Sequence, residues 1–219
     1  MNIYLKKFRN ASLEELKNLK PEEIKIFKNT PIKESLTIVA RLPLQALRNI
    51  KKLISELKRI EPSHYYYPTG QLHLTILGNI PAEINVKRVN RTIKETILLY
   101  SLNFNLWGLG SNVYCSSISA YPISFSIHKL REKLRQKLGG VGADYKKPTL
   151  TKQLSLYEYM GWINYLRFLK KPKQKLLDKL YELKDRNFSK ATIKRIEVYK
   201  NTSKVLDPKK ADLISSFNL

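Results

Sequence analysis

Residues 65–77 read YYYPTGQLHLTIL, and the predictions of the fold and of the site both depend on this stretch. A strand is predicted over 71–78, because apolar and polar residues alternate there. Alternate side chains of a strand point to opposite faces, so His73 and Thr75 share one face, about 6–7 Å apart. An imidazole that transfers a proton, beside a hydroxyl that donates a hydrogen bond, suits chemistry on a phosphate. The residues expected to face a core are Leu72, Leu74 and Ile76.

The elements around this strand occur twice in the same order. The first repeat, about 35–109, has predicted strands at 35–42, 71–78 and 102–108 and helices at 44–60 and 83–99. The second repeat, about 113–200, has predicted strands at 113–121, 161–169 and 191–200 and helices at 123–138 and 172–185. This duplication predicts an α+β fold in which two pseudo-symmetric lobes of antiparallel sheet and helices surround a central cleft.

The first 31 residues lie outside the repeats. Ser12 and Glu15 have the spacing of a capping box, and Pro21 has the place of a first-turn proline. We therefore expect an N-terminal helical extension over 1–31, with short helices at about 12–19 and 21–28. Residues 32–219 are expected to form a single bilobal domain.

The composition points to a polyanionic partner. The 219 residues include 41 Lys and Arg against 18 Asp and Glu, so the net charge is +23, which attracts nucleic acid. The alternative is a compositional bias that leaves the lysines on solvated helix faces. No apolar run is long enough to span a bilayer, so we expect no membrane partner and a cytoplasmic protein, with a monomer favoured.

Cysteine and histidine are scarce. One cysteine, Cys115, excludes an internal disulfide framework, and three histidines make a zinc cluster unexpected, so neither a metal nor a cofactor is predicted. His64, His128 and Cys115 are interpreted as structural residues.

The His73-Leu74-Thr75-Ile76 strand after its YYYP approach resembles the first signature motif of the 2H phosphoesterase superfamily. This superfamily includes the bacterial 2'-5' RNA ligase (LigT-like) proteins and 2',3'-cyclic phosphodiesterases. The resemblance covers roughly residues 35–219. It implies two lobes related by duplication, each with a His-x-Thr/Ser motif facing a cleft. It also implies a metal-independent mechanism with one histidine as base and the other as acid, in which His73 and Thr75 are catalytic.

The second motif departs from this pattern. Residues 161–168 read GWINYLRF, and when they are aligned on Leu-Arg-Phe the expected histidine falls on Trp162 and the expected Thr/Ser on Asn164. The Asn164 amide can still donate to phosphate, and Trp162 can stack on a base or ribose. Arg167 alternates with these two in a flat strand, so it is predicted to point away from the cleft and is retained as a weaker phosphate contact.

Two segments have open alternatives. Tyr67, in the tyrosine run, is expected either to stack on a nucleobase beside the cleft or to pack at the strand entrance. Residues 142–153 are expected to form a cleft-edge loop that holds a polyanion, with an ordinary solvated loop as the alternative.

These observations favour an enzyme whose partner is an RNA or nucleotide phosphate. We predict a 2H-like phosphoesterase acting on RNA ends or nucleotides with 2',3'-cyclic or 2'-5' linkages, impaired by loss of the second histidine. A catalytically inactive 2H-fold protein that binds RNA or a nucleotide is the main alternative. A basic scaffold protein, in which His-x-Thr is accidental, is the third.

Overall fold

The computed structural model describes residues 3–140, 157–203, 206–207 and 211–219, and the predicted loop at 142–153 falls outside them. The helices described are α1 (Ile3–Asn18), α2 (Leu44–Ile60), α3 (Val86–Thr96), α4 (Ile127–Lys137) and α6 (Gln174–Glu182). The strands are β1 (Pro31–Arg41), β2 (Tyr65–Tyr66), β3 (His73–Pro81), β4 (Asn103–Ser111), β5 (Cys115–Ile123), β6 (Gly161–Arg167), β7 (Asn187–Thr192), β8 (Arg195–Ser203) and β9 (Asp212–Asn218). Short 3-10 turns cover Pro21–Glu23, Thr69–Gln71, Ile97–Leu99 and Tyr157–Tyr159.

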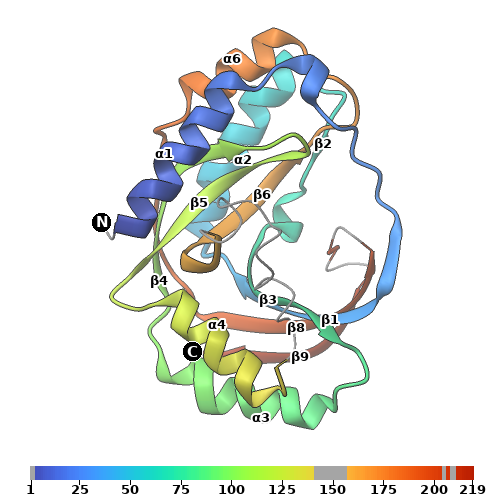
Figure 1. Cartoon of the computed structure of the whole chain (residues 1–219), viewed down its shortest axis with the longest axis vertical. Coiled ribbons are helices and arrows are strands. Elements are labelled where there is room, and N and C mark those ends of the chain that lie inside the picture. Colours follow the sequence, from blue (N-terminus) through green and yellow to red (C-terminus); the bar gives the residue numbers. More distant parts are fainter. Residues whose placement is uncertain (1–2, 141–156, 204–205, 208–210) are drawn as a thin grey trace.

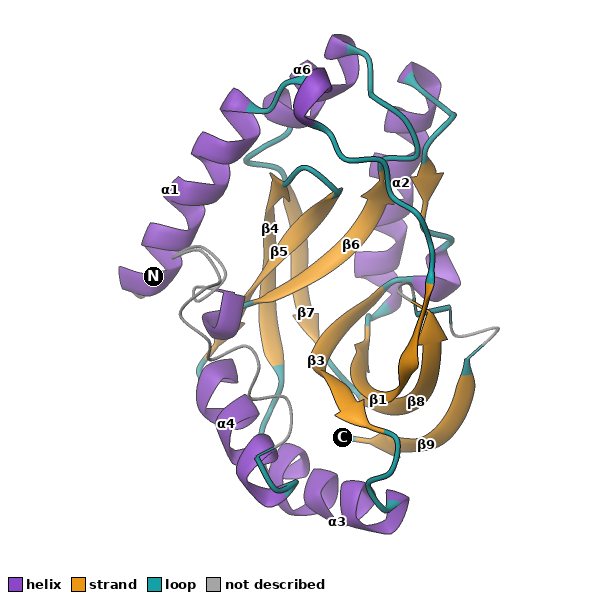
Figure 2. Ribbon diagram, turned by 45° about the vertical axis from the view of Figure 1, so that its right-hand side comes forward, coloured by secondary structure: helices purple, strands orange, loops and turns teal. Residues whose placement is uncertain are grey.

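The strands form two antiparallel sheets, which confirms the predicted α+β fold (Figure 1). One sheet has the order β3-β1-β8-β9 and is strongly curled, and the other has the order β2-β6-β5-β4-β7 (Figure 2). The two motif strands are β3, which carries His73 and Thr75, and β6, which carries Trp162 and Asn164. Each motif strand pairs with the first strand of its own repeat, and that strand pairs with the last strand of the other repeat, in the orders β3-β1-β8 and β6-β5-β4. The motif strands therefore occupy equivalent positions in the two sheets. The last strand of each repeat lies in the other repeat's sheet, because β4 pairs with β5 and β8 pairs with β1.

Helices cover both sheets. Helix α2 packs against β7 and β6, whereas α4 packs against β3 and α3. The buried residues of α2 form one stripe of helical spacing: Ala46, Ile50, Leu53, Ile54 and Leu57. Helices α3 and α4 lie together at one end of the molecule, and α1 and α6 lie at the other (Figure 2).

The N-terminal segment belongs to the same core as the sheets. Helix α1 packs on β4 and α6, and Leu16, Leu19 and Ile24 are buried in the main hydrophobic cluster. The Arg9 guanidinium donates to the Leu109 carbonyl at 3.2 Å. The extension is therefore packed onto the sheets.

Three predicted elements were wrong in detail. A single helix, α1, replaces the one expected at 12–19, and no helix follows at 24–28. That segment is extended because the Lys25 and Phe27 amides donate to the carbonyls of Val113 (2.8 Å) and Phe168 (2.7 Å). The strand expected at 191–200 is two strands, β7 and β8, in different sheets, and β9 was not predicted.

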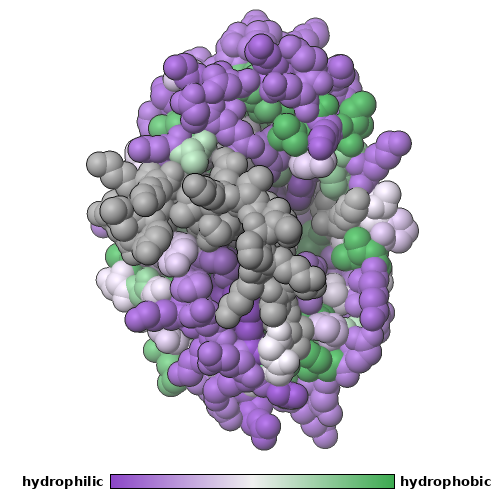
Figure 3. Space-filling view, in the orientation of Figure 1, coloured by the Kyte–Doolittle hydropathy of each residue, from purple (hydrophilic) through white to green (hydrophobic). Residues whose placement is uncertain are grey.

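The described part of the face shown in Figure 3 is largely hydrophilic, with small separate hydrophobic patches. Within the described ranges, no helix combines the length and the apolar character needed to cross a membrane.

Candidate functional site

A pocket of about 190 Å³ lies between β3 and β6 and brings together every site residue predicted from the sequence. These residues are Tyr67, His73, Thr75, Trp162, Asn164 and Arg167. Other described residues that line it are Ile32, Thr37, Gly78, Asn79, Asn201 and Leu206. We call this cavity the phosphate pocket, because hydroxyl, amide and guanidinium donors converge in it.

Strand β3 presents His73 and Thr75 as the alternation predicted. Both side chains are half-buried at the pocket, whereas Leu74 and Ile76 are buried in the core. In the ladder with β1, Thr75 lies opposite Val39 and His73 lies opposite Arg41. The neighbouring strand therefore places a cation close to the imidazole.

His73 is held as a neutral imidazole. Its Nδ1 lies 2.7 Å from the Gln71 carbonyl, and because a carbonyl only accepts, Nδ1 carries the proton and Nε2 is left as an acceptor. The pKa of His73 is lowered to about 4, because burial, together with the Arg41 charge, outweighs the opposing effects of the Gln71 carbonyl and Glu197. At neutral pH the side chain can therefore accept a proton.

Strand β6 contains a β-bulge that corrects the prediction for Arg167. Ser117 of β5 lies opposite Asn164, but Ser116 lies opposite Leu166, so Tyr165 is one extra residue. A bulge shifts the alternation by one residue, so Arg167 returns to the face of Trp162 and Asn164. Arg167 lines the phosphate pocket, and the prediction that it points away was wrong.

Arg167 is oriented by two aromatic residues. Its Nε donates to the Tyr67 hydroxyl at 3.1 Å, and its guanidinium lies 5.0 Å from the centre of the Phe27 ring. Tyr67 is only 4% exposed, and its amide donates to the Tyr165 carbonyl at 3.0 Å. In this structure Tyr67 therefore serves as packing and as a support for Arg167.

The Asn164 amide is also oriented. The Cys115 thiol lies between two acceptors, Asn112 Oδ1 at 3.5 Å and Asn164 Oδ1 at 3.7 Å. The contact with Asn164 Oδ1 leaves the Asn164 NH₂ group as the donor available to the pocket. Burial raises the pKa of Cys115, so the thiol stays protonated and keeps this role.

Arg131 of α4 links β3 to the residue that precedes β6. Its Nε donates to the Ile76 carbonyl at 2.8 Å and its Nη2 to the Thr75 carbonyl at 3.1 Å. Its Nη1 donates to the Met160 carbonyl at 2.9 Å, just before β6, and its guanidinium lies 5.5 Å from the Trp162 ring centre. Sequence reasoning missed this residue; the available signal was an arginine next to Leu130 in the apolar stripe of a helix.

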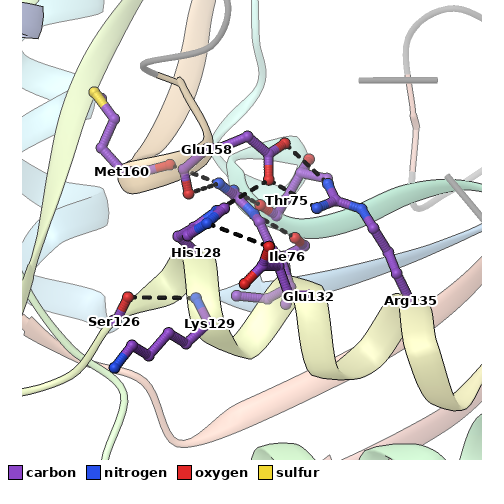
Figure 4. A network of polar contacts seen from close by, with 10 residues as sticks. Thr75, Ile76, Ser126, His128, Lys129, Glu132, Arg135, Glu158 and Met160 are labelled. Atoms are coloured by element: carbon purple, nitrogen blue, oxygen red, sulfur yellow. Dashed lines mark hydrogen bonds and ion pairs between the residues drawn. The ribbon is translucent and has the colours of Figure 1, made fainter. Parts of the chain in front are cut away.

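The other two histidines lie outside the pocket. His64 is buried with its Nε2 3.5 Å from Glu61 Oε2. His128 projects from α4, where its Nε2 lies 3.4 Å from Glu132 Oε1 (Figure 4). Its ring lies 4.6 Å from the Tyr159 ring, tilted by 33°. Of the residues described at the pocket, His73 alone carries an imidazole.

Thr37 and Asn201 are site residues that sequence reasoning missed. They come from β1 and β8, which bring them to the pocket through strand pairing across the chain. For Thr37 the available signal was its alternation with the buried Leu36 and Ile38 beside the His73 strand. The Asn201 amide donates to the Ser203 carbonyl at 2.5 Å, which fixes its orientation.

The donor set suits an anion. Over the described parts of the chain, no group of three or more His, Cys, Asp or Glu residues is arranged to hold a metal ion. Hydroxyl, amide and guanidinium donors satisfy phosphate oxygens.

Solved structures show what the fold resembles. The protein TT0787 of Thermus thermophilus matches with a TM-score of 0.59 at 16% identity, over 84% of this chain and 97% of that one. E. coli LigT matches with a TM-score of 0.50 in its complexes with NADP+ (13% identity, 87% and 99% coverage) and with phosphate (12%, 86% and 98%). No family model and no curated protein sequence matches the chain. The fold implied by the resemblance to 2H phosphoesterases is thereby confirmed.

Proposed function

We propose that this chain, which has the fold of E. coli LigT, is a 2H-like phosphoesterase acting on RNA ends or nucleotides with 2',3'-cyclic or 2'-5' phosphodiester linkages. The observation that carries the proposal is the convergence of His73, Thr75, Asn164 and Arg167 on one small pocket between the sheets. The crystal structures of LigT with phosphate and with NADP+ support a phosphate-bearing ligand for this fold.

In the proposed mechanism His73 is the general base. Its Nε2 removes a proton from a water molecule as the water oxygen bonds to phosphorus. The bond from phosphorus to a ribose oxygen breaks on the opposite side, and that oxygen takes a proton from solvent. The pKa of about 4 keeps this nitrogen unprotonated at neutral pH. The proton on Nδ1 stays on the Gln71 carbonyl, which holds the ring in this tautomer.

Donors around phosphorus stabilise the developing charge. The Arg167 guanidinium, the Asn164 amide and the Thr75 hydroxyl donate to the non-bridging oxygens. Each is fixed by its surroundings: Arg167 by Tyr67, Asn164 by Cys115, and Thr75 by the β3 backbone that Arg131 holds. Fixed donors need no reorganisation as the charge develops.

A strong general acid is absent from the described lining of the pocket. Trp162 has the place of the second histidine, and burial raises the pKa of Tyr67, which makes its hydroxyl a poorer acid. A positioned acid contributes roughly 10²–10⁴-fold, so turnover is expected to be slow.

The same substitution of histidine by Trp162 favours a second candidate, a protein that binds RNA or a nucleotide without processing it. Trp162 packs with Tyr121 and Met160 and is well placed to contact a ribose or base, which is a binding role. The pocket's anion donors would serve this function equally.

An assay without metal separates the two candidates. The protein would be incubated with a 2',3'-cyclic nucleotide and a 2'-5'-linked dinucleotide. We expect slow turnover that His73→Ala abolishes, and that His128→Ala, a matched change outside the pocket, leaves intact. RNA binding without turnover, unaffected by His73→Ala, would establish the binding protein instead.

A further inference from the structure

A second cavity, of about 470 Å³, adjoins the phosphate pocket. Asn201 lines both cavities, so they share a wall. The volume lies within the range of small-molecule sites, whereas the phosphate pocket is small enough for little more than a phosphate. We call this second space the base cavity.

The aromatic residues of the base cavity are Phe27 and Tyr65. Phe27 comes from the N-terminal extension, and its amide donates to the Phe168 carbonyl at 2.7 Å, so its backbone is anchored just beyond β6. The Tyr65 hydroxyl donates to Gln71 Oε1, and its ring packs edge-on against Tyr67 at 5.1 Å. Rings held in this way bind a flat ligand without first being ordered.

Arg167 connects the two cavities. Its side chain lines the phosphate pocket while its guanidinium stacks on Phe27, 5.0 Å from the ring centre. A phosphate bound by Arg167 would therefore be separated from the base cavity by the Phe27 ring. In a single nucleotide, an anionic phosphate and a flat base are likewise joined side by side.

The remaining wall offers polar groups for the edge of a base. Asn29, Gln71 and Asp207 contribute amide and carboxylate groups to the cavity. Bases outside a duplex are recognised by aromatic stacking together with hydrogen bonds to their edges.

We infer that the base cavity binds the nucleobase of a nucleotide whose phosphate occupies the phosphate pocket, and that Phe27 provides the stacking surface. The inference rests on the proposed function for its phosphate. It gives the N-terminal extension a role in substrate recognition, which neither the repeats nor the motif strands suggest.

Calorimetric titration with two probes tests this inference. Inorganic phosphate reports the phosphate pocket alone, and adenosine 3'-monophosphate reports both cavities. We expect the wild type to bind the nucleotide more tightly than phosphate. Phe27→Leu removes the ring but keeps apolar bulk, and it should weaken nucleotide binding about 5- to 100-fold, since stacking on one aromatic ring is worth that much.

Two further variants control for indirect effects. Phe27→Tyr keeps the ring and should retain nucleotide affinity. Ile26→Ala changes a neighbouring side chain that is 51% exposed and should change neither affinity. Phosphate affinity should stay within about twofold in Phe27→Tyr and Ile26→Ala. Phe27→Leu should weaken phosphate binding much less than nucleotide binding, because Phe27 contacts the Arg167 guanidinium but donates nothing to phosphate itself.

Each other outcome has a definite meaning. If Phe27→Leu weakens phosphate and nucleotide equally, Phe27 acts through Arg167 and the inference is overturned. It is also overturned if the wild type binds both probes equally. If nucleotide binding depends on Phe27 but no phosphodiester is cleaved, the enzyme proposal fails and the base cavity stands. If phosphate does not bind at all, both fail.

Discussion

His73 is prepared to accept a proton, and this has a measurable consequence. Its pKa lies below the ordinary value of 6.5, at about 4, so the side chain is neutral across the neutral range and becomes protonated only as the pH falls through 4. We expect kcat/KM for a 2',3'-cyclic nucleotide to be flat from about pH 8 to pH 5 and to fall about tenfold per pH unit below 4. A decline centred near pH 6.5 would show that His73 is not buried as a neutral base.

Trp162 allows a test of the missing acid. Trp162→His places an imidazole opposite His73 and should raise turnover, up to the 10²–10⁴-fold that a positioned acid supplies. Trp162→Phe is the matched control, because it removes the indole packing on Met160 and Tyr121 without adding a proton donor. The ratio of the two turnover rates, measured at equal folded fraction, gives the contribution of a general acid at position 162. Equal rates would mean that position 162 does not reach the leaving group.

Part of the site could be predicted from the sequence, because regular alternation in a strand places side chains without knowledge of its neighbours. His73 and Thr75 follow from alternation in a regular strand. Arg167 does not, because one extra residue in β6 reverses its side, and bulges depend on the partner strand. Thr37 and Asn201 reach the pocket because β1 pairs with β8, and no local pattern in the sequence shows which strands pair at long range.

At the scale of elements, the two motif strands approach closely at Gly161. A Cβ at this position would lie 2.7 Å from Leu74 Cδ1 and 2.9 Å from Leu74 Cγ, and Leu74 is fully buried. Overpacking of this kind costs about 1–3 kcal/mol, so Gly161→Ala should lower the free energy of unfolding by about that amount. Urea denaturation measures the change.

Gly70→Ala is the matched control for this prediction. No atom lies within 4 Å of the Cβ it would add, so its stability should change by less than about 0.5 kcal/mol. If both variants unfold at the same urea concentration as the wild type, β3 and β6 are not in close contact at Gly161.

The ends of a helix could be predicted where apolar residues recur at helical spacing along its whole length. Helix α2 begins and ends at the predicted residues because five buried side chains follow one stripe. The segment after Pro21 has helix-start residues. The Lys25 and Phe27 amides nevertheless donate to the carbonyls of Val113, before β5, and Phe168, after β6, so tertiary hydrogen bonds override the local preference. The chain leaves one sheet for the other at Ile193 and Lys194, which is why β7 and β8 look like one strand in the sequence.

At the scale of the whole molecule, the charge of +23 predicts salt-dependent binding of RNA. A shallow cavity of about 830 Å³ along α2 is lined by basic residues, which include Arg48, Lys51, Lys52 and Arg59. The carboxylate of Glu56 in this wall is neutralised by Arg186 at 2.6 Å and Lys179 at 3.2 Å. The α2 groove therefore presents a cationic surface to a phosphate backbone.

We expect the double substitution Lys51→Glu and Lys52→Glu to weaken binding of single-stranded RNA. The slope of log affinity against log salt concentration should become shallower by about 0.7 for each phosphate that these lysines no longer neutralise. Lys129→Glu with Lys133→Glu, on exposed positions of α4, changes the net charge equally and should have a smaller effect. Fluorescence anisotropy over a range of salt concentrations measures both. An identical weakening in the two double variants would mean that only net charge matters.

Each repeat contributes its last strand to the sheet of the other repeat, and this exchange also affects how the chain folds. The sheet that carries His73 needs β8, whose Ile196 pairs with Ala40 near the opposite end of the sequence. Contacts of such high sequence separation slow folding, because a long loop must close before any of its stabilisation is gained. A chain still emerging from the ribosome has both motif strands before it has β8. We therefore expect nucleotide binding to appear only after β8 has been synthesised, and both sheets to form in one cooperative step.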